Sequence, residues 1–148
     1  MLSSSKVANE DYLEHAIPML NQHLPNIKEL LFIPFAAVSV SWDDYTTKVQ
    51  HALPGFKVKG IHQFSQASQA LENAQAILVG GGNTFNLLNE LYCQDLISTL
   101  KSQVKKGIPY IGWSAGSNIC GNSIRTTNDM PIIQPPSFDA LNFIPVQL

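Results

Sequence analysis

The sequence predicts an α/β fold: a doubly wound, mostly parallel sheet with helices on both faces. Four apolar, strand-like runs alternate with segments of helical periodicity. Three of those runs are nearly continuous in hydrophobic residues, as expected for strands that are covered on both faces. Strands alternating with helices favour right-handed crossovers and a parallel sheet. At 148 residues the chain fits one α/β domain spanning residues 1–148.

The predicted elements follow one another in regular alternation. Strands are expected at residues 29–38, 56–64, 76–81 and 109–114, and helices at residues 9–24, 41–53, 65–73 and 84–106. Ser41, with Asp44 three residues later, resembles a capping box for the second helix, and Ser65 is a plausible N-cap for the third. The fourth helix is predicted to break near Gln94 and to end at Gly107.

Both ends of the chain look incomplete in this pattern. Residues 1–5 are at best the tail of a strand, and residues 142–148 form an apolar run that is predicted to be strand-like and stops without a cap or turn behind it. Because domains rarely end inside a core strand, we expect a domain truncated at its C-terminus.

Composition excludes several classes of function. A net charge of −2 and a single arginine supply no basic surface for nucleic acid. The two cysteines suit a reducing cytosol, and neither has a second ligand at a metal-binding spacing. The apolar runs are too short to cross a membrane, and the N-terminus lacks the apolar core of a signal peptide. We expect a soluble, cytoplasmic protein without a metal ion or cofactor.

The segment GWSAG, residues 112–116, satisfies the pattern G-x-S-x-G between a predicted strand and a helix-compatible segment. In such an elbow Ser114 is a nucleophile in a strained backbone conformation, and small neighbours avoid collisions with the turn. The N–H of Ala115 would then point at the developing oxyanion. An ordinary strand-to-helix connection is the alternative explanation.

A second glycine cluster lies at the end of the third predicted strand. Gly80, Gly81, Gly82 and Asn83 directly precede a helix, at the sheet edge where ligands bind in open α/β folds. A glycine run allows backbone N–H groups to approach a substrate and complete an oxyanion hole. A phosphate-binding Walker loop is excluded because no Gly-Lys-Ser/Thr follows.

The general base is harder to find. A catalytic serine needs a histidine, which an acid must orient. All four histidines precede Ser114, in segments that the β-α order does not bring to it. The carboxylates that follow it are Asp129 and Asp139.

These motifs resemble the peptidase E family of cytoplasmic aspartyl dipeptidases, serine peptidases with a fold like that of class I glutamine amidotransferases. The matching segments are FIPFA, VGGGNTFNLL, YIGWSAGSN, IRTTNDMPI and FDALNFIPVQL, in the family's order. The resemblance implies hydrolysis of dipeptides with an N-terminal aspartate, through an acyl-enzyme and without cofactor.

The resemblance also implies roles for individual residues. Ser114 matches the nucleophile and Asp129 the acid of the triad, whereas Gly81, Gly82 and Asn83 with Ala115 match the oxyanion and substrate-binding segment. The family's histidine lies in an Asn-Pro-His segment directly after the counterpart of residues 143–148. The 148-residue chain is therefore expected to be inactive.

Other interpretations stay open at this point. Arg125, the only arginine, is a candidate for binding a substrate carboxylate or an ordinary surface residue. The chain is also compatible with a cyanophycinase-like serine hydrolase that acts on aspartate-containing polymers, or with a non-catalytic remnant. The sequence does not determine the oligomeric state.

Overall fold

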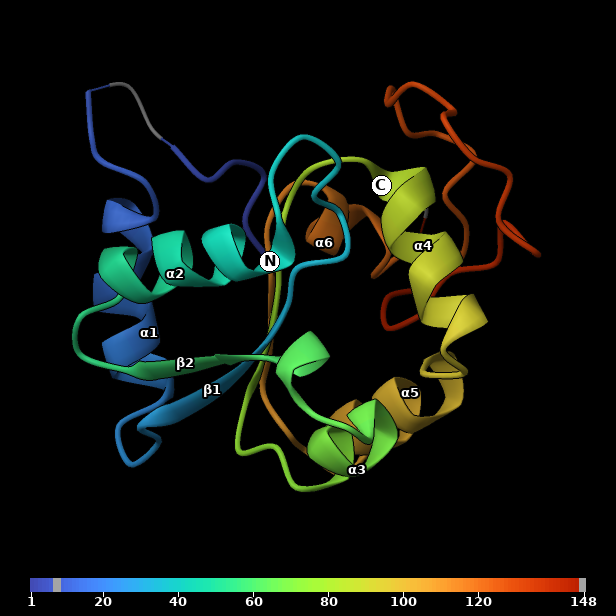
Figure 1. The fold of residues 1–148 in the computed structure, drawn as a ribbon. Helices are drawn as coiled ribbons and strands as arrows, with labels where there is room; N and C mark the ends of the chain where they lie inside the picture. The colour runs from blue at the N-terminus through green and yellow to red at the C-terminus, as the bar shows by residue number, and fades with distance from the viewer. Residues whose placement is uncertain (7–8, 147–148) are drawn as a thin grey trace.

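The computed structural model describes residues 1–6 and 9–146 of the chain. Its centre is a parallel sheet of four strands, β1 (Glu29–Ile33), β2 (Lys57–Gly60), β3 (Ile77–Val79) and β4 (Tyr110–Gly112), in the order β2-β1-β3-β4 (Figure 1). The direction of winding reverses between β1 and β3. The carboxyl ends of these two strands therefore flank the position where ligands bind in doubly wound sheets.

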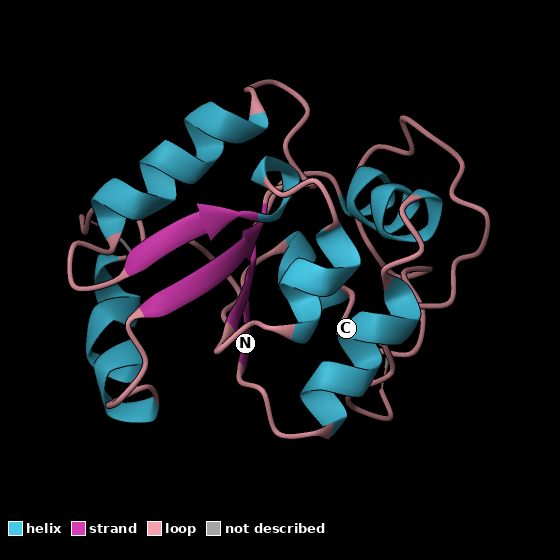
Figure 2. Ribbon diagram, turned by 60° about the horizontal axis from the view of Figure 1, so that its bottom comes forward, coloured by secondary structure: helices cyan, strands magenta, loops and turns pink. Residues whose placement is uncertain are grey.

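Helices cover both faces of the sheet. Their bounds are η1 (Glu14–Ala16), α1 (Ile17–His23), α2 (Trp42–Ala52), η2 (Ile61–Gln63), α3 (Ala67–Glu72), α4 (Thr84–Cys93), α5 (Ile97–Lys105) and α6 (Ala115–Asn118). Helices α1 and α2 lie on one face, and α3, α4, α5 and α6 on the other (Figures 1 and 2).

The side chains of β1 show how the two faces form. Leu30 and Phe32 pack with α1 and α2, whereas Leu31 and Ile33 pack into the cluster on the opposite face. Successive residues of a strand point to opposite faces, so a strand that is covered on both sides needs apolar residues at every position. The continuous apolar runs in the sequence have this origin, and the predicted fold class is confirmed.

The predicted elements occur in the predicted order but with shorter bounds. Ser41 caps α2 by accepting the backbone N–H of Asp44 at 3.0 Å, as predicted. The break after α4 is also confirmed, with Gln94 as its C-cap and Asp95 at a φ of 53°. The prediction of Ser65 as an N-cap is wrong, because α3 begins two residues later and has no side-chain cap.

The two ends of the chain behave differently from one another. Leu2 pairs in parallel with Trp113 beside β4, which agrees with the predicted strand tail. The strand predicted at residues 142–148 is wrong for its described part, since Asn142 adopts a φ of 54° and residues 143–146 are bends. This segment instead donates backbone N–H groups to the carbonyls of Cys120 and Gly121. Residues 147–148 lie outside the described residues. Among the described helices, none has the length and apolar character that crossing a membrane requires.

Candidate active site

Ser114 occupies the sharp turn between β4 and α6. Its φ of 52° and ψ of −118° lie in a region that side-chain-bearing residues rarely adopt. The turn is held from two sides, because the N–H of Ser114 donates to the carbonyl of Leu2 at 3.1 Å and that of Trp113 donates to Val79 at 3.3 Å. Ser114 is partly buried, and the geometry is that of the strand-to-helix elbow that the sequence predicted.

Glycine is required on both sides of this elbow. A Cβ atom on Gly112 would lie 2.3 Å from the carbonyl oxygen of Gly116, and one on Gly116 would lie 2.2 Å from that of Val79. Val79 belongs to β3 and Gly116 to α6, so neither backbone oxygen can move without disturbing its own element. The small residues around Ser114 therefore have the steric purpose that the pattern suggested.

Ser117 contributes a contact that the sequence analysis did not identify. Its hydroxyl lies 2.7 Å from the carbonyl of Leu2 and 2.8 Å from that of Gly112, and it donates to these oxygens from the first turn of α6. The side chain thus fastens α6 to both strand segments beside the elbow.

The glycine loop after β3 packs directly against Ser114. A Cβ atom on Gly81 would lie 2.9 Å from the Cβ atom of Ser114. Gly82 has a φ of 142°, and a Cβ atom there would lie 2.2 Å from the carbonyl oxygen of Ala36. Within the described part of the chain, the backbone N–H groups of Gly81 and Gly82 donate to no protein acceptor. The loop therefore leaves two hydrogen-bond donors close to the serine.

A chain of hydrogen bonds links the elbow to the glycine loop. Trp113 Nε1 donates to the hydroxyl of Tyr12 at 3.1 Å, Tyr12 donates to that of Tyr45 at 3.1 Å, and Tyr45 donates to the carbonyl of Gly81 at 3.0 Å. Burial raises the pKa of both tyrosines above the usual value, so both hydroxyls stay protonated and able to donate. This series of hydrogen bonds holds the orientation of the Gly81 carbonyl.

Asp129 lies at the N-terminus of α4, beside the glycine loop. Its Oδ2 atom accepts from the backbone N–H of Thr84 at 2.7 Å and from the Thr84 hydroxyl at 2.5 Å. A carboxylate is stabilised there by the helix dipole as well. Asn83 caps the same helix by accepting the N–H of Asn86 at 3.0 Å, and its amide donates to the carbonyl of Met130 at 2.7 Å. These bonds tie the segment of Asp129 to the glycine loop.

The elbow, the glycine loop and Asp129 line one pocket of about 600 Å³ at the carboxyl ends of β1, β3 and β4. Its walls also include the loop after β1, part of α2 and the N-terminal segment; the residues are Ser5, Tyr12, Ala36, Ala37, Val38, Ser39, Val40, Asp44, Tyr45, Lys48, Gly81, Gly82, Asn83, Trp113, Ser114 and Asp129. Ala115 follows Ser114 as the first residue of α6 and is buried. The site forms at the position that the order of the strands predicts.

Other candidate residues lie elsewhere. Arg125 is exposed and outside the pocket lining, and its guanidinium lies over the ring of Phe138, 5.3 Å from the centroid. None of the four histidines lines the pocket, and all four belong to the described residues. His62, for example, pairs with Asp43 at 2.9 Å on the far side of α2 from Tyr45.

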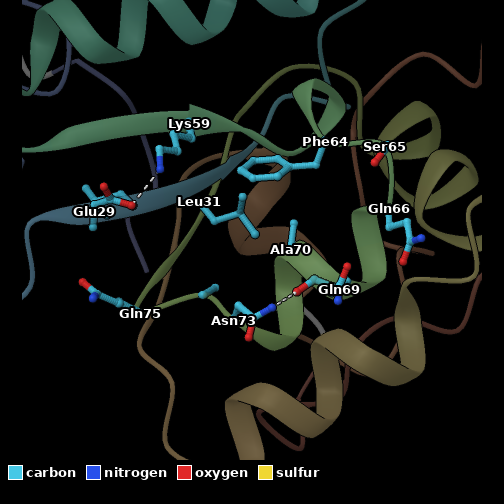
Figure 3. A pocket seen from close by; sticks show the side chains of 12 residues that line it. Glu29, Leu31, Lys59, Phe64, Ser65, Gln66, Gln69, Ala70, Asn73 and Gln75 are labelled. Carbon is cyan, nitrogen blue, oxygen red and sulfur yellow. Dashed lines mark hydrogen bonds and ion pairs between the residues drawn. The ribbon is translucent and has the colours of Figure 1, made fainter.

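A second pocket, of about 310 Å³, lies between β1, β2 and α3 (Figure 3). Glu29, the first residue of β1, pairs there with Lys59 at 2.9 Å. This pocket lies toward the amino end of β1. Because the strands are parallel, it is away from Ser114, which follows the carboxyl end of β4. It contributes nothing to the candidate active site.

Comparison with known proteins agrees with this geometry. The sequence model of the family described as "Peptidase family S51" matches residues 1–148, which is the whole chain. The chain belongs to peptidase family S51. It is 55% identical over 150 residues to peptidase E of Shewanella denitrificans and 53% identical to peptidase E of Shewanella oneidensis. Both alignments cover all of this chain and 64% of the relative, so the chain spans about 64% of the length of these curated relatives.

Solved structures also resemble this family member. A putative peptidase E protein from Listeria monocytogenes superposes with a TM-score of 0.77 at 28% identity, and the match covers 97% of this chain and 73% of that one. A peptidase from an acI-B1 actinobacterium gives a TM-score of 0.64 at 17% identity, covering 93% and 62% of the two chains, and supports the fold alone.

Proposed function

We propose that this chain carries the nucleophile and oxyanion hole of a serine peptidase that hydrolyses dipeptides with an N-terminal aspartate. The observation that carries the proposal is the strained elbow of Ser114 packed against the glycine loop. Membership of the family and the printed name of its relatives, peptidase E, support peptide hydrolysis. The aspartate specificity comes from the resemblance of the sequence motifs.

The proposed reaction proceeds in two steps. The hydroxyl oxygen of Ser114 attacks the carbonyl carbon of the scissile peptide bond, and a base removes its proton. The resulting oxyanion receives hydrogen bonds from the N–H of Ala115 and from those of Gly81 and Gly82, which have no protein acceptor in the described residues. The bond to nitrogen breaks, the amine leaves with the proton, and water hydrolyses the acyl-enzyme.

Asp129 is proposed as the acid that orients the catalytic histidine. Oδ2 is already engaged by Thr84, and Oδ1 is the oxygen left to accept a hydrogen bond from an imidazole. Since none of the four histidines lines the pocket, we propose that this histidine lies outside the 148 residues. The 148-residue chain alone is accordingly expected to hydrolyse dipeptides no faster than an enzyme stripped of its base.

The remaining features of the proposal are simple. Neither a metal ion nor a cofactor is needed for this chemistry, and the partner is a small acidic dipeptide rather than nucleic acid or a membrane. The reaction is proposed to take place in the cytoplasm.

The proposal is tested by a panel of dipeptides. The protein, extended at its C-terminus to the length of its relatives, is incubated with Asp-Leu, Asn-Leu, Glu-Leu and Leu-Leu, and free leucine is measured. The proposal predicts rapid release from Asp-Leu and release slower by at least about tenfold from the other three. Equal release from Leu-Leu would exclude the proposed specificity, and release from none would exclude the proposed activity.

A further inference from the structure

Lys48 is the only cationic side chain among the described residues that line the Ser114 pocket. It projects from α2, one turn after Asp44, and is exposed at the pocket wall. A pocket of this size that holds one lysine is suited to a small ligand with a negative charge.

The ammonium group of Lys48 is held in place without being neutralised. Nζ lies 4.4 Å from the ring centroid of Tyr12, within the range of a cation–π contact. No carboxylate of the described residues lies within 4.0 Å of it, whereas Lys57 and Lys59 both pair with Glu29. Lys48 therefore keeps its hydrogen-bonding capacity for a ligand.

The nearest acidic neighbour along α2 is already engaged. Asp44 lies four residues before Lys48, and its Oδ2 atom accepts the hydroxyl of Ser41 at 2.7 Å, at the N-terminus of the helix. The helix dipole and this bond stabilise the Asp44 carboxylate where it is. An incoming carboxylate would not have to displace it from Lys48.

The aromatic support of Lys48 is connected to the elbow. The ring of Tyr12 meets that of Trp113 edge-on, with centroids 6.4 Å apart and an interplanar angle of 81°. The hydroxyl of Tyr12 also accepts from Trp113 Nε1, and Trp113 directly precedes Ser114. The aromatic pair thus connects the ring that Lys48 contacts to the residue that precedes the nucleophile.

We propose that Lys48 binds a carboxylate of the substrate by a charge-assisted hydrogen bond and thereby determines specificity. The identity of the substrate rests on the proposed function, but the binding itself requires no turnover. Arg125, the other candidate, lies outside the pocket lining on the ring of Phe138. An Asp-X dipeptide has two carboxylates, on the aspartate side chain and at the C-terminus, and the experiment distinguishes them.

The test is a binding measurement on the protein extended at its C-terminus to the length of its relatives, with Ser114→Ala, which prevents turnover. Calorimetric titrations with Asp-Leu, Asn-Leu and Asp-leucinamide compare a dipeptide with two analogues that each lack one negative charge. The analogue that lacks the recognised carboxylate should bind about tenfold more weakly or worse. A preference against Asn-Leu identifies the side-chain carboxylate, and one against Asp-leucinamide identifies the C-terminal one.

Substitutions then assign the preference to the lysine. Lys48→Met should abolish the preference, and Lys48→Arg should retain most of it. Lys28→Met is the matched control, because Lys28 also lies over an aromatic ring, Phe56, at 6.0 Å but outside the pocket. Thermal unfolding of each variant shows that the fold is intact.

Three results would overturn the inference: an unchanged preference in Lys48→Met, no preference between the three ligands, or no binding of Asp-Leu at millimolar concentration. Lys48-dependent binding without hydrolysis by the extended protein would refute the proposed function and support this inference. Hydrolysis that is independent of Lys48 would do the reverse.

Discussion

Replacing Ser114 with glycine should make the domain more stable, although it removes the nucleophile. A residue with a side chain at a φ of 52° and a ψ of −118° pays about 1–3 kcal/mol in backbone strain. Glycine relieves that strain but loses about 0.5–1 kcal/mol more chain entropy on folding. The Ser114 side chain makes no hydrogen bond within the described residues that would offset the gain. The net expectation is a gain of about 1 kcal/mol.

Urea unfolding followed by tryptophan fluorescence measures this gain in the free energy of unfolding. In thermal unfolding, the same gain should raise the melting temperature by about 2–4 °C in a domain of this size. Ser102→Gly is the matched control, because Ser102 is an exposed residue within the regular helix α5. There the same substitution should cost about 0.5–1 kcal/mol. If Ser114→Gly destabilises the domain as much as the control does, Ser114 is not strained and the elbow argument fails.

Three further perturbations test the packing around the site. Gly116→Ala places a Cβ atom 2.2 Å from the carbonyl oxygen of Val79 and should lower the free energy of unfolding by about 1–3 kcal/mol or more. A variant that unfolds at the same urea concentration as the wild type would contradict this. Tyr45→Phe removes a hydrogen bond to the glycine loop, so the free energy of unfolding should fall by about 1 kcal/mol. In the extended protein, kcat should fall with little change in KM. An unchanged kcat would show that the bond does not position the loop. Burial raises the pKa of the Cys120 thiol to about 11. At pH 8, iodoacetamide should therefore label exposed Cys93 and leave Cys120 unmodified until the protein unfolds. Equal labelling of the two thiols would show that Cys120 is accessible in the folded state.

Local sequence signals predict the fold class and the backbone geometry of the elbow and the glycine loop. The continuous apolar runs predict strands covered on both faces, and the glycine patterns predict the elbow and the loop beside it. Both depend on residues that are near one another in the chain. The steric need for glycine at position 116 even follows from the turn itself.

Contacts between residues far apart in the sequence could not be predicted from it. Tyr12 meets Trp113 across 101 residues, and Tyr45 meets the loop carbonyl across 36 residues, so no spacing signals either contact. Lys48 is one of several lysines until the fold places it in the pocket. The apolar run at residues 142–148 has the composition of a strand, but hydrophobic periodicity does not show that the described part of this segment bonds to the loop after α6.

The most direct test of the account compares the wild-type protein with Ser114→Ala in the hydrolysis of Asp-Leu, with both proteins extended to the length of their relatives. Loss of the nucleophile should lower kcat by roughly 10⁴-fold or more, while the melting temperature stays at or above that of the wild type. Ser117→Ala is a control that removes a neighbouring hydroxyl, which holds α6 rather than attacking substrate, and turnover should persist in it. A Ser114→Ala protein that hydrolyses Asp-Leu at the wild-type rate would contradict the assignment of Ser114 as the nucleophile.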